Sequence, residues 1–197
     1  MLSDGFHDVP RGKVAMVVTD LEMTSPRLRH VPLPEGLTFG TLPRDVPGYR
    51  DVFSRVGQPW LWYGRTVMDD AALSAILTDP AVQLFALSKD GRAEALLELD
   101  FRESGACELA YFGLTPALIG SGAGAYLMDQ AIAKAFETDA VRRFHLHTCT
   151  IDSPQALGFY RRSGFAPIRQ RIEIADDPRI AHGYDRALAP HVPLIDI

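Results

Sequence analysis

The chain has 197 residues, of which 47% are hydrophobic and 23% are charged, and its formal net charge at pH 7 is −5. This length suits one domain with a full core, and the composition is too apolar for a disordered chain. Because 25 acidic residues outnumber 20 basic ones and the basic residues do not cluster, nucleic acid and anionic membrane surfaces are disfavoured as partners.

The sequence shows no sign of membrane targeting or of a disulfide framework. No apolar run approaches the roughly 20 residues that cross a bilayer, and Met1–Asp4 lacks the start of a signal peptide. The two cysteines, Cys107 and Cys149, have no Cys-x-x-Cys spacing, so we expect free thiols. We therefore predict a cytoplasmic protein.

The first 81 residues are predicted to form two strands and two short helices. Three prolines between the strands exclude a helix there, and the second helix begins at a pair of aspartates suited to capping. A loop with three large aromatic residues, Gln58–Gly64, separates the helices. The four elements are the strands Val14–Met23 and Leu37–Leu42 and the helices Asp45–Val56 and Asp69–Leu77.

The rest of the chain alternates strands and helices. Asp90-Gly91 predicts a tight antiparallel hairpin, Ser153 and Pro154 are placed to be the N-cap and first residue of a helix, and Gly164 is placed to end it. No element is predicted after Ala175. The further elements are the strands Val82–Ser88, Ala93–Phe101, Cys107–Leu114, Phe144–Thr150 and Ile168–Ile174 and the helices Ala125–Phe136 and Ser153–Gly164. This order predicts a mixed α/β fold.

The most informative motif is a glycine-rich run just before the helix Ala125–Phe136. Glycines at 120, 122 and 124 let the backbone turn N–H groups toward a ligand, and the helix start adds partial positive charge, so the run is suited to phosphate. A dinucleotide fingerprint is disfavoured because five residues separate the run from the preceding strand, and a Walker loop lacks its Lys-Ser/Thr. A tight strand-to-helix connection is the other reading.

Two segments resemble the GNAT superfamily of acetyl-CoA-dependent N-acetyltransferases. Ile119–Gly124 is similar to the family signature Gln/Arg-x-x-Gly-x-Gly/Ala, with Ile119 departing at its first position. Thr150–Phe165 is similar to the segment Asn-x-x-Ala-x-x-Phe/Leu-Tyr-x-x-x-Gly-Phe, with Asp152 in place of Asn. The likeness covers residues 82–174 well and the N-terminal part only in pattern.

The resemblance implies a fold and a domain plan. A central, mostly antiparallel twisted sheet flanked by helices would contain one parallel strand pair, Cys107–Leu114 and Phe144–Thr150, that splays apart. Residues 1–197 would form a single domain, with a cofactor-binding core at about 82–174, acceptor-side elements at 1–81 and a C-terminal tail at 175–197. The tail could pack on a second copy, which leaves a homodimer open.

The resemblance also implies that acetyl-CoA is the acetyl donor. The pantetheine arm would pair with the first of the splayed strands, and the diphosphate would lie against the glycine-rich run. The residues expected to bind the donor are Phe112, Gly113, Leu114, Ile119, Gly120, Ser121, Gly122, Ala123, Gly124, Ala125, Asp152, Ala156 and Tyr160.

Catalytic roles follow from the same resemblance. Tyr160 would protonate the departing thiolate, and Glu108 would accept a proton from the acceptor amine through water. On strand alternation we expect Glu108 to share a face with Ala110 and Phe112. Glu98 and Asp100 are rival bases, and all three carboxylates could instead be solvated at a sheet face.

Residues of the aromatic loop and a nearby carboxylate are expected to bind the acceptor. Trp60, Trp62, Tyr63 and Glu98 would line a site for a small-molecule amine or an N-terminal amine, although the aromatics could also be core residues. His145, His147 and Cys149 alternate on one strand, but packing in a central strand is favoured over a metal site.

Three functions from different classes are compared. The favoured one transfers an acetyl group from acetyl-CoA to a primary amine by direct attack in a ternary complex. A non-catalytic acyl-CoA-binding or sensing module is the main alternative, suggested by Ile119 and Asp152. An oxidoreductase with a nucleotide cofactor is the third.

Overall fold

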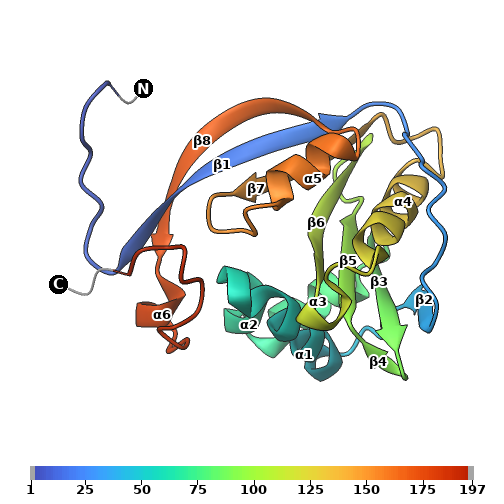
Figure 1. Cartoon of the computed structure of the whole chain (residues 1–197), viewed down its shortest axis with the longest axis horizontal. Coiled ribbons are helices and arrows are strands. Elements are labelled where there is room, and N and C mark those ends of the chain that lie inside the picture. Colours follow the sequence, from blue (N-terminus) through green and yellow to red (C-terminus); the bar gives the residue numbers. More distant parts are fainter. Residues whose placement is uncertain (1–2, 195–197) are drawn as a thin grey trace.

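The computed structural model describes residues 3–194, and the strands of this part form one twisted mixed sheet (Figure 1). Along the sheet the order is β2-β3-β5-β6-β7-β1-β8, with β4 paired to β3. Among the described residues, β6 and β7 are the one parallel pair. The predicted fold class is therefore confirmed. The strands are β1 Lys13–Met23, β2 Leu37–Thr41, β3 Val82–Lys89, β4 Arg92–Ala93, β5 Ala95–Asp100, β6 Ala106–Leu114, β7 Arg143–Cys149 and β8 Ala166–Asp176.

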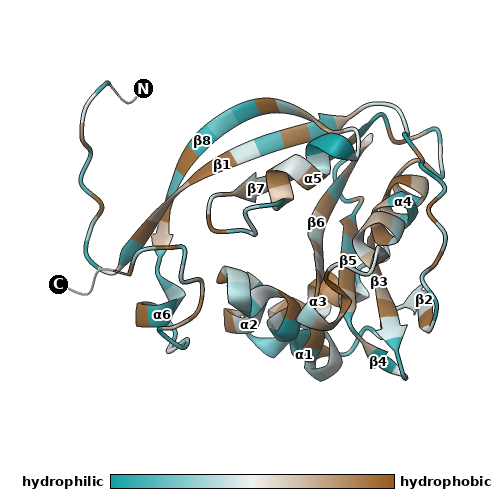
Figure 2. Ribbon diagram, in the orientation of Figure 1, coloured by the Kyte–Doolittle hydropathy of each residue, from teal (hydrophilic) through white to brown (hydrophobic). Residues whose placement is uncertain are grey.

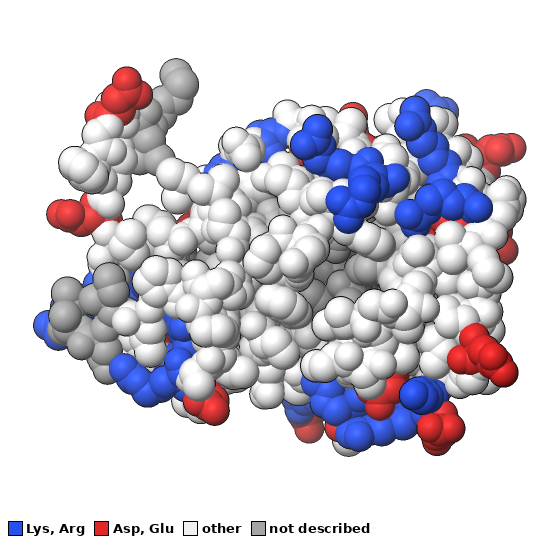
Figure 3. Space-filling model, in the orientation of Figure 1, with Lys and Arg blue, Asp and Glu red and all other residues white. Residues whose placement is uncertain are grey.

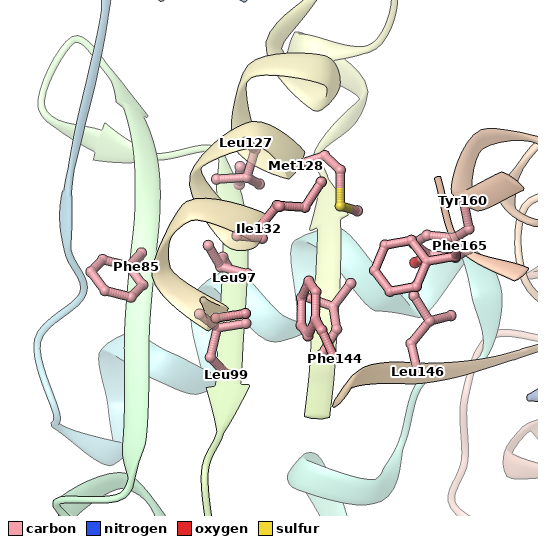
Figure 4. Close-up of a cluster of buried hydrophobic side chains, with 14 of the residues drawn as sticks. Phe85, Leu97, Leu99, Leu127, Met128, Ile132, Phe144, Leu146, Tyr160 and Phe165 are labelled. Atoms are coloured by element: carbon pink, nitrogen blue, oxygen red, sulfur yellow. The ribbon is translucent and has the colours of Figure 1, made fainter. Parts of the chain in front are cut away.

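Helices cover both faces of the sheet. On one face α4 and α5 pack over the middle strands, where Leu127, Met128 and Ile132 meet Leu97 and Phe144 in a buried cluster (Figure 4). On the other face a second cluster joins α1 and α3 to the sheet. No helix among residues 3–194 is long and apolar enough to cross a membrane. The helices are α1 Val46–Gly57, α2 Gly64–Val67, α3 Asp70–Thr78, α4 Ala123–Ala135, α5 Ala156–Arg162 and α6 Pro178–Ala181, with 3₁₀ turns at Gln58–Trp60 and Pro116–Leu118.

Local signals in the sequence account for several element boundaries. Asp90 and Gly91 both have positive φ, +51° and +78°, as the predicted tight turn requires. The Asp69 carboxylate accepts the Ala72 N–H at 2.8 Å and caps α3. Gly164, at φ +106°, follows the end of α5 as predicted.

The predicted start of α5 is wrong by two residues. The helix begins at Ala156, and its N-cap, Gln155, makes no capping bond with its side chain. Ser153 instead lies in a turn, because its carbonyl accepts the Ala156 N–H at 2.8 Å. Its hydroxyl is occupied by the Gln155 side chain at 2.7 Å.

The first strand lies far from the second in the sheet. β1 pairs antiparallel with β7 on one side and with β8 on the other, and β1 and β8 arch together beyond the rest of the sheet (Figure 1). β8 is one of the two edge strands, and hydrophobic and hydrophilic residues alternate in bands along it (Figure 2). The N-terminal strand thus lies between β7 and β8, in the half of the sheet away from β2.

A β-bulge in β6 corrects the predicted face of Glu108. Leu109 pairs with Leu99 and Tyr111 with Glu98, so Ala110 is the extra residue. The bulge reverses the alternation: Leu109 and Phe112 both face the α4 side, whereas Tyr111 faces α1. By alternation from Leu109, Glu108 therefore shares its face with Tyr111, on the side of α1, and does not share it with Phe112.

The part of the tail that the structure describes after β8, up to residue 194, packs on the chain itself. It contains α6, which the sequence did not predict, and its buried Arg179 donates to Asp177 at 2.7 Å and to the Val192 carbonyl at 3.0 Å. Tyr184 donates its hydroxyl to the Trp62 carbonyl at 3.1 Å. The tail therefore supports the aromatic loop that precedes α2.

Candidate active site

The parallel strands β6 and β7 separate after a short paired stretch. Their register pairs run from Ala106 with Arg143 to Glu108 with His145 and then stop. A cavity of about 900 Å³ lies beyond this point, between the two strands and the elements around them. The predicted splay is confirmed, and we call the space between the separated strands the wedge.

The wedge opens in a hollow on a face of the molecule where charged side chains are sparse. Lys, Arg, Asp and Glu surround the hollow but leave its centre clear (Figure 3). Most of the predicted site residues lie on the cavity wall. These are Trp60, Trp62, Tyr63, Phe112, Gly113, Leu114, Ile119, Gly120, Gly122, Gly124, Ala125, Asp152, Ala156 and Tyr160. The predicted residues outside the wall are Ser121, Ala123, Glu98 and Glu108.

The glycine-rich run presents free donors to the cavity. Ser121 and Ala123 use their backbone N–H groups within the run, bonding to the Leu118 carbonyl and the Ser121 hydroxyl. Within the described residues, the N–H groups of Gly120, Gly122 and Gly124 have no partner. Buried or ligand-facing N–H groups without partners are what an anion requires.

The backbone of this run fits a phosphate group. Gly120 and Gly122 have φ of +83° and +84°, and no atom lies within 4 Å of where a Cβ would stand on either residue. That open space lies at the start of α4, whose first turn carries no acidic residue. Ile119, 64% exposed, offers no polar contact there.

The edge of β6 supplies further backbone groups along the wedge. Thr115 donates its N–H to the Glu94 carbonyl at 2.9 Å. In an antiparallel ladder the bonded residues alternate, so Gly113 also faces β5, and Phe112 and Leu114 turn their N–H and C=O groups toward the wedge. An extended ligand can pair with these groups as an added strand.

Tyr160 lies in the wedge on α5. Its ring packs against Phe112 and Phe165, with centroids 6.2 and 6.1 Å away. Its hydroxyl bonds to no group among residues 3–194, and burial, helped by the Asp152 carboxylate, raises the pKa of the phenol above its ordinary value. The group is therefore protonated at neutral pH and free to donate.

The three candidate bases differ in their surroundings. Glu98 is fully buried and is held by the Arg65 guanidinium at 2.5 Å and by the Tyr49 hydroxyl. Asp100 is bound by Arg102, and those hydrogen bonds lower the pKa of its carboxyl despite partial burial. Glu108 is the most exposed of the three, since 37% of its side chain is accessible.

Glu108 also has a partner that reaches the cavity. Its Oε1 lies 3.8 Å from Nδ1 of His147, a β7 residue on the cavity wall. The pair spans the strands at the point where the wedge opens. The place of His147 in a central strand indicates packing, and no spacing in the sequence links it to Glu108.

Asp152 and Trp62 form a contact that sequence reasoning missed. The Trp62 Nε1–H donates to Asp152 Oδ1 at 3.1 Å, while Asp152 Oδ2 accepts from the Thr148 hydroxyl at 2.7 Å and the Cys149 N–H at 3.0 Å. All three partners are donors, and a carboxylate accepts from all of them, as an amide could not. The departure from Asn at this position was the available signal.

The other aromatic residues of the loop face the tail. Trp60 meets His191 edge-on at 5.9 Å, and Tyr63 stacks on His182 at 5.4 Å. Among residues 3–194, no three His, Cys, Asp or Glu side chains are grouped to hold a metal ion. This end of the cavity is thus walled by aromatic rings and by residues of β1 and β8.

Solved structures with a similar fold come from several bacteria. A protein of unknown function from Staphylococcus epidermidis shares 13% identity over 84% of this chain and 63% of its own, with a TM-score of 0.61. A GCN5-related N-acetyltransferase from Sphaerobacter thermophilus shares 17% identity over 93% of this chain and 54% of its own, with a TM-score of 0.62. This chain thus spans less than two thirds of either protein.

A shorter structure is also similar, an aminoglycoside acetyltransferase from an uncultured soil metagenomic sample. It shares 15% identity over 66% of this chain and 88% of its own, with a TM-score of 0.54. At such identities these likenesses concern the fold. No curated protein matches the sequence.

The family itself is shown by the sequence. Residues 49–165 match the family described as Acetyltransferase (GNAT) family. The matched segment is more than half of the chain and includes the aromatic loop, the wedge strand β6, the glycine-rich run and α5. The chain is therefore a member of the GNAT family of acetyltransferases.

Proposed function

We propose that this protein transfers an acetyl group from acetyl-CoA to a primary amine, by direct attack in a ternary complex. The observation that carries the proposal is the wedge, where paired strands part beside three glycine N–H groups that have no partner in the described part of the chain. The family's acyl transfer fits this arrangement. When bound, acetyl-CoA would supply an activated acetyl thioester.

Backbone groups would hold the donor. The N–H groups of Gly120, Gly122 and Gly124 would bind the diphosphate, and the edge of β6 at Phe112 and Leu114 would bind the pantetheine amides. An N–H near Leu114 would also stabilise negative charge that develops on the acyl oxygen. These contacts need no side chain at Ile119, which explains how the motif tolerates that residue.

Side chains would move the protons. Glu108, with His147 beside the cavity, would accept the proton of the acceptor ammonium, whose pKa near 10.4 keeps it charged at neutral pH. The amine nitrogen then adds to the acetyl carbon, and the carbon–sulfur bond breaks as the resulting oxyanion collapses, while the nitrogen releases its second proton to solvent. Tyr160 would donate its proton to the departing sulfur and recover one from solvent.

The acceptor is proposed to bind at the aromatic end of the cavity. Trp60 and Tyr63 with the tail residues offer apolar walls, which suits a small amine or an N-terminal amine with an apolar part. Because an aminoglycoside acetyltransferase has a similar fold, polycationic small molecules belong among the amines to test. Glu98 is bound to Arg65, so it would stabilise residues behind the cavity wall and would not contact the acceptor directly.

An acyl-transfer screen tests the proposal. Release of free CoA thiol would be followed with acetyl-CoA and a panel of amino acids, polyamines, aminoglycosides and short peptides. Turnover with any amine supports the enzyme, whereas CoA binding without turnover across the panel supports the acyl-CoA-binding module. The cytoplasmic location and a homodimer stay predictions; the exposed isoleucines of edge strand β8 make the oligomeric state worth measuring by light scattering.

A further inference from the structure

We propose that the Trp62 indole closes the wedge on the acceptor side and restricts the donor to short acyl groups. The inference rests on the proposed function, because it concerns the acyl chain of the donor. It gives Trp62 a role toward the donor that Trp60, in the same loop, does not have.

Two glycines far apart in the sequence make room for the indole. A Cβ on Gly57, at the end of α1, would lie 2.6 Å from Trp62 Cβ and 2.7 Å from Cδ2. A Cβ on Gly113, in β6, would lie 3.3 Å from Trp62 Cη2 and would overlap Val56. A side chain at Gly57 would displace the ring, and one at Gly113 would displace Val56 and press on the ring edge, so the space left by the two glycines fits the indole closely.

The indole contacts residues on both sides of the wedge. Its ring packs against Tyr111 of β6, with centroids 5.2 Å apart, and its N–H donates to Asp152, just beyond the end of β7. Asp152 is itself held by Thr148 and the Cys149 N–H. One side chain thus joins the two strands that have separated.

Trp62 lies on the face of the sheet opposite the donor loop. Leu114, on β6, lies next to Gly124 of the glycine-rich run, and Phe112 stacks on Phe159 of α5 at 5.6 Å. Tyr111 and Gly113 point the other way, toward α1 and the indole. A donor held at α4 would pass its acyl group into the wedge from one face, and Trp62 stands at the other.

The consequence is a limit on acyl length. An acetyl group ends within the wedge, whereas a chain several methylenes longer must displace the indole, break its bond to Asp152 or fold back. Trp60 meets His191 of the tail, and among the described residues its side chain makes no hydrogen bond or ring contact to the separated strands. It therefore serves as a matched control for the loss of a tryptophan from this loop.

The test measures binding in the absence of acceptor, so that it does not depend on turnover. Dissociation constants for free CoA and for acetyl-, butanoyl-, hexanoyl- and octanoyl-CoA would be determined by calorimetry for the wild type, Trp62→Ala, Trp62→Leu and Trp60→Ala. For the wild type and Trp60→Ala we expect hexanoyl-CoA to bind at least tenfold more weakly than acetyl-CoA. For both Trp62 variants we expect that penalty to disappear.

Wild-type protein alone can overturn the inference, even if a variant fails to fold. Equal affinity of the wild type for acetyl- and octanoyl-CoA would refute it, as would a length penalty that persists in both Trp62 variants. Failure of the wild type to bind free CoA would refute the proposed function as well, which distinguishes the two. Asp152→Asn, which retains a carbonyl acceptor for the indole but not both sets of bonds, should relax the penalty partly.

Discussion

Replacing Tyr160 with phenylalanine isolates what one hydroxyl group contributes. The ring contacts Phe112, Phe159 and Phe165 with centroids 6.2, 5.7 and 6.1 Å away, and phenylalanine keeps all three contacts. Because the hydroxyl has no partner among residues 3–194, its removal leaves no other group unpaired. We therefore expect the free energy of unfolding to change by less than about 1 kcal/mol.

The effect on turnover should be much larger. Burial and Asp152 raise the pKa of Tyr160, so the phenol carries its proton across the whole neutral range. General acids contribute about 10²- to 10⁴-fold, and we expect kcat to fall about 10²-fold in Tyr160→Phe. That fall corresponds to roughly 2.7 kcal/mol of lost transition-state stabilisation.

Three measurements decide the outcome: thiol release with a good acceptor for kcat, calorimetry for the acetyl-CoA Kd, and thermal melting for stability. The Kd and the melting temperature should remain close to those of the wild type. Tyr126→Phe is a matched control, since Tyr126 lies on α4 outside the cavity wall. A folded Tyr160→Phe protein with near-full kcat would show that Tyr160 only packs and that water protonates the sulfur.

Further predictions concern the donor site and the tail. Gly122→Val forces a valine to adopt φ of +84° and should weaken CoA binding at least tenfold in calorimetry while the domain stays folded; unchanged affinity would place the diphosphate elsewhere. Arg162 lines the cavity and has no ion-pair partner among the described residues. Arg162→Gln should therefore weaken CoA binding several-fold, and the loss of affinity should be larger at low salt. Arg161 lies outside the cavity wall, so Arg161→Gln should leave CoA binding unchanged. Arg179→Met leaves the buried Asp177 carboxylate without its guanidinium partner, at a cost of about 3–5 kcal/mol. The tail should then become sensitive to protease and the acceptor KM should rise, and an unaltered digestion pattern would contradict this. Although burial raises it, hydrogen bonding to Arg179 lowers the pKa of the Asp177 carboxyl overall. The stability that this ionised carboxylate contributes is therefore complete above its unfolded pKa of about 3.9 and is lost as the pH falls through its folded pKa. In melts at acid pH the wild type should show this loss of stability, and Asp177→Asn should not.

Local chemistry was enough to predict most elements of the core. Apolar periodicity identified α4, the Asp90-Gly91 turn predicted the hairpin that joins β3 to β4 and continues into β5, and the two motif segments implied the separated parallel strands. These signals lie within short stretches of chain, where each residue's conformation depends on near neighbours. They predict well because packing reinforces them.

What the sequence could not show depends on contacts between distant segments. The bulge at Ala110 has no glycine or proline to mark it, and it reversed the expected face of Glu108. The contact between Trp62 and Asp152 joins residues 90 positions apart, and it requires space left by Gly113. Neither is visible in periodicity or spacing, because both arise only when the sheet is assembled.

The position of β1 has a consequence for how the protein is made. This strand is synthesised before its partners, β7 and β8, which are completed only after residues 149 and 176. At about 5–20 residues per second, the interval until β8 emerges is on the order of ten seconds. During that time apolar residues such as Val18 and Leu21, almost fully buried in the finished fold, have no native neighbours.

High contact order of this kind slows folding and exposes a strand to misassociation. The hairpin β3–β5 and the α1–α3 side can form first, since their contacts are local. We expect the half of the sheet that holds β7 to form last, when β8 pairs with β1. A chaperone that shields the nascent N-terminal segment would therefore be expected to raise the yield of active protein without altering its final stability.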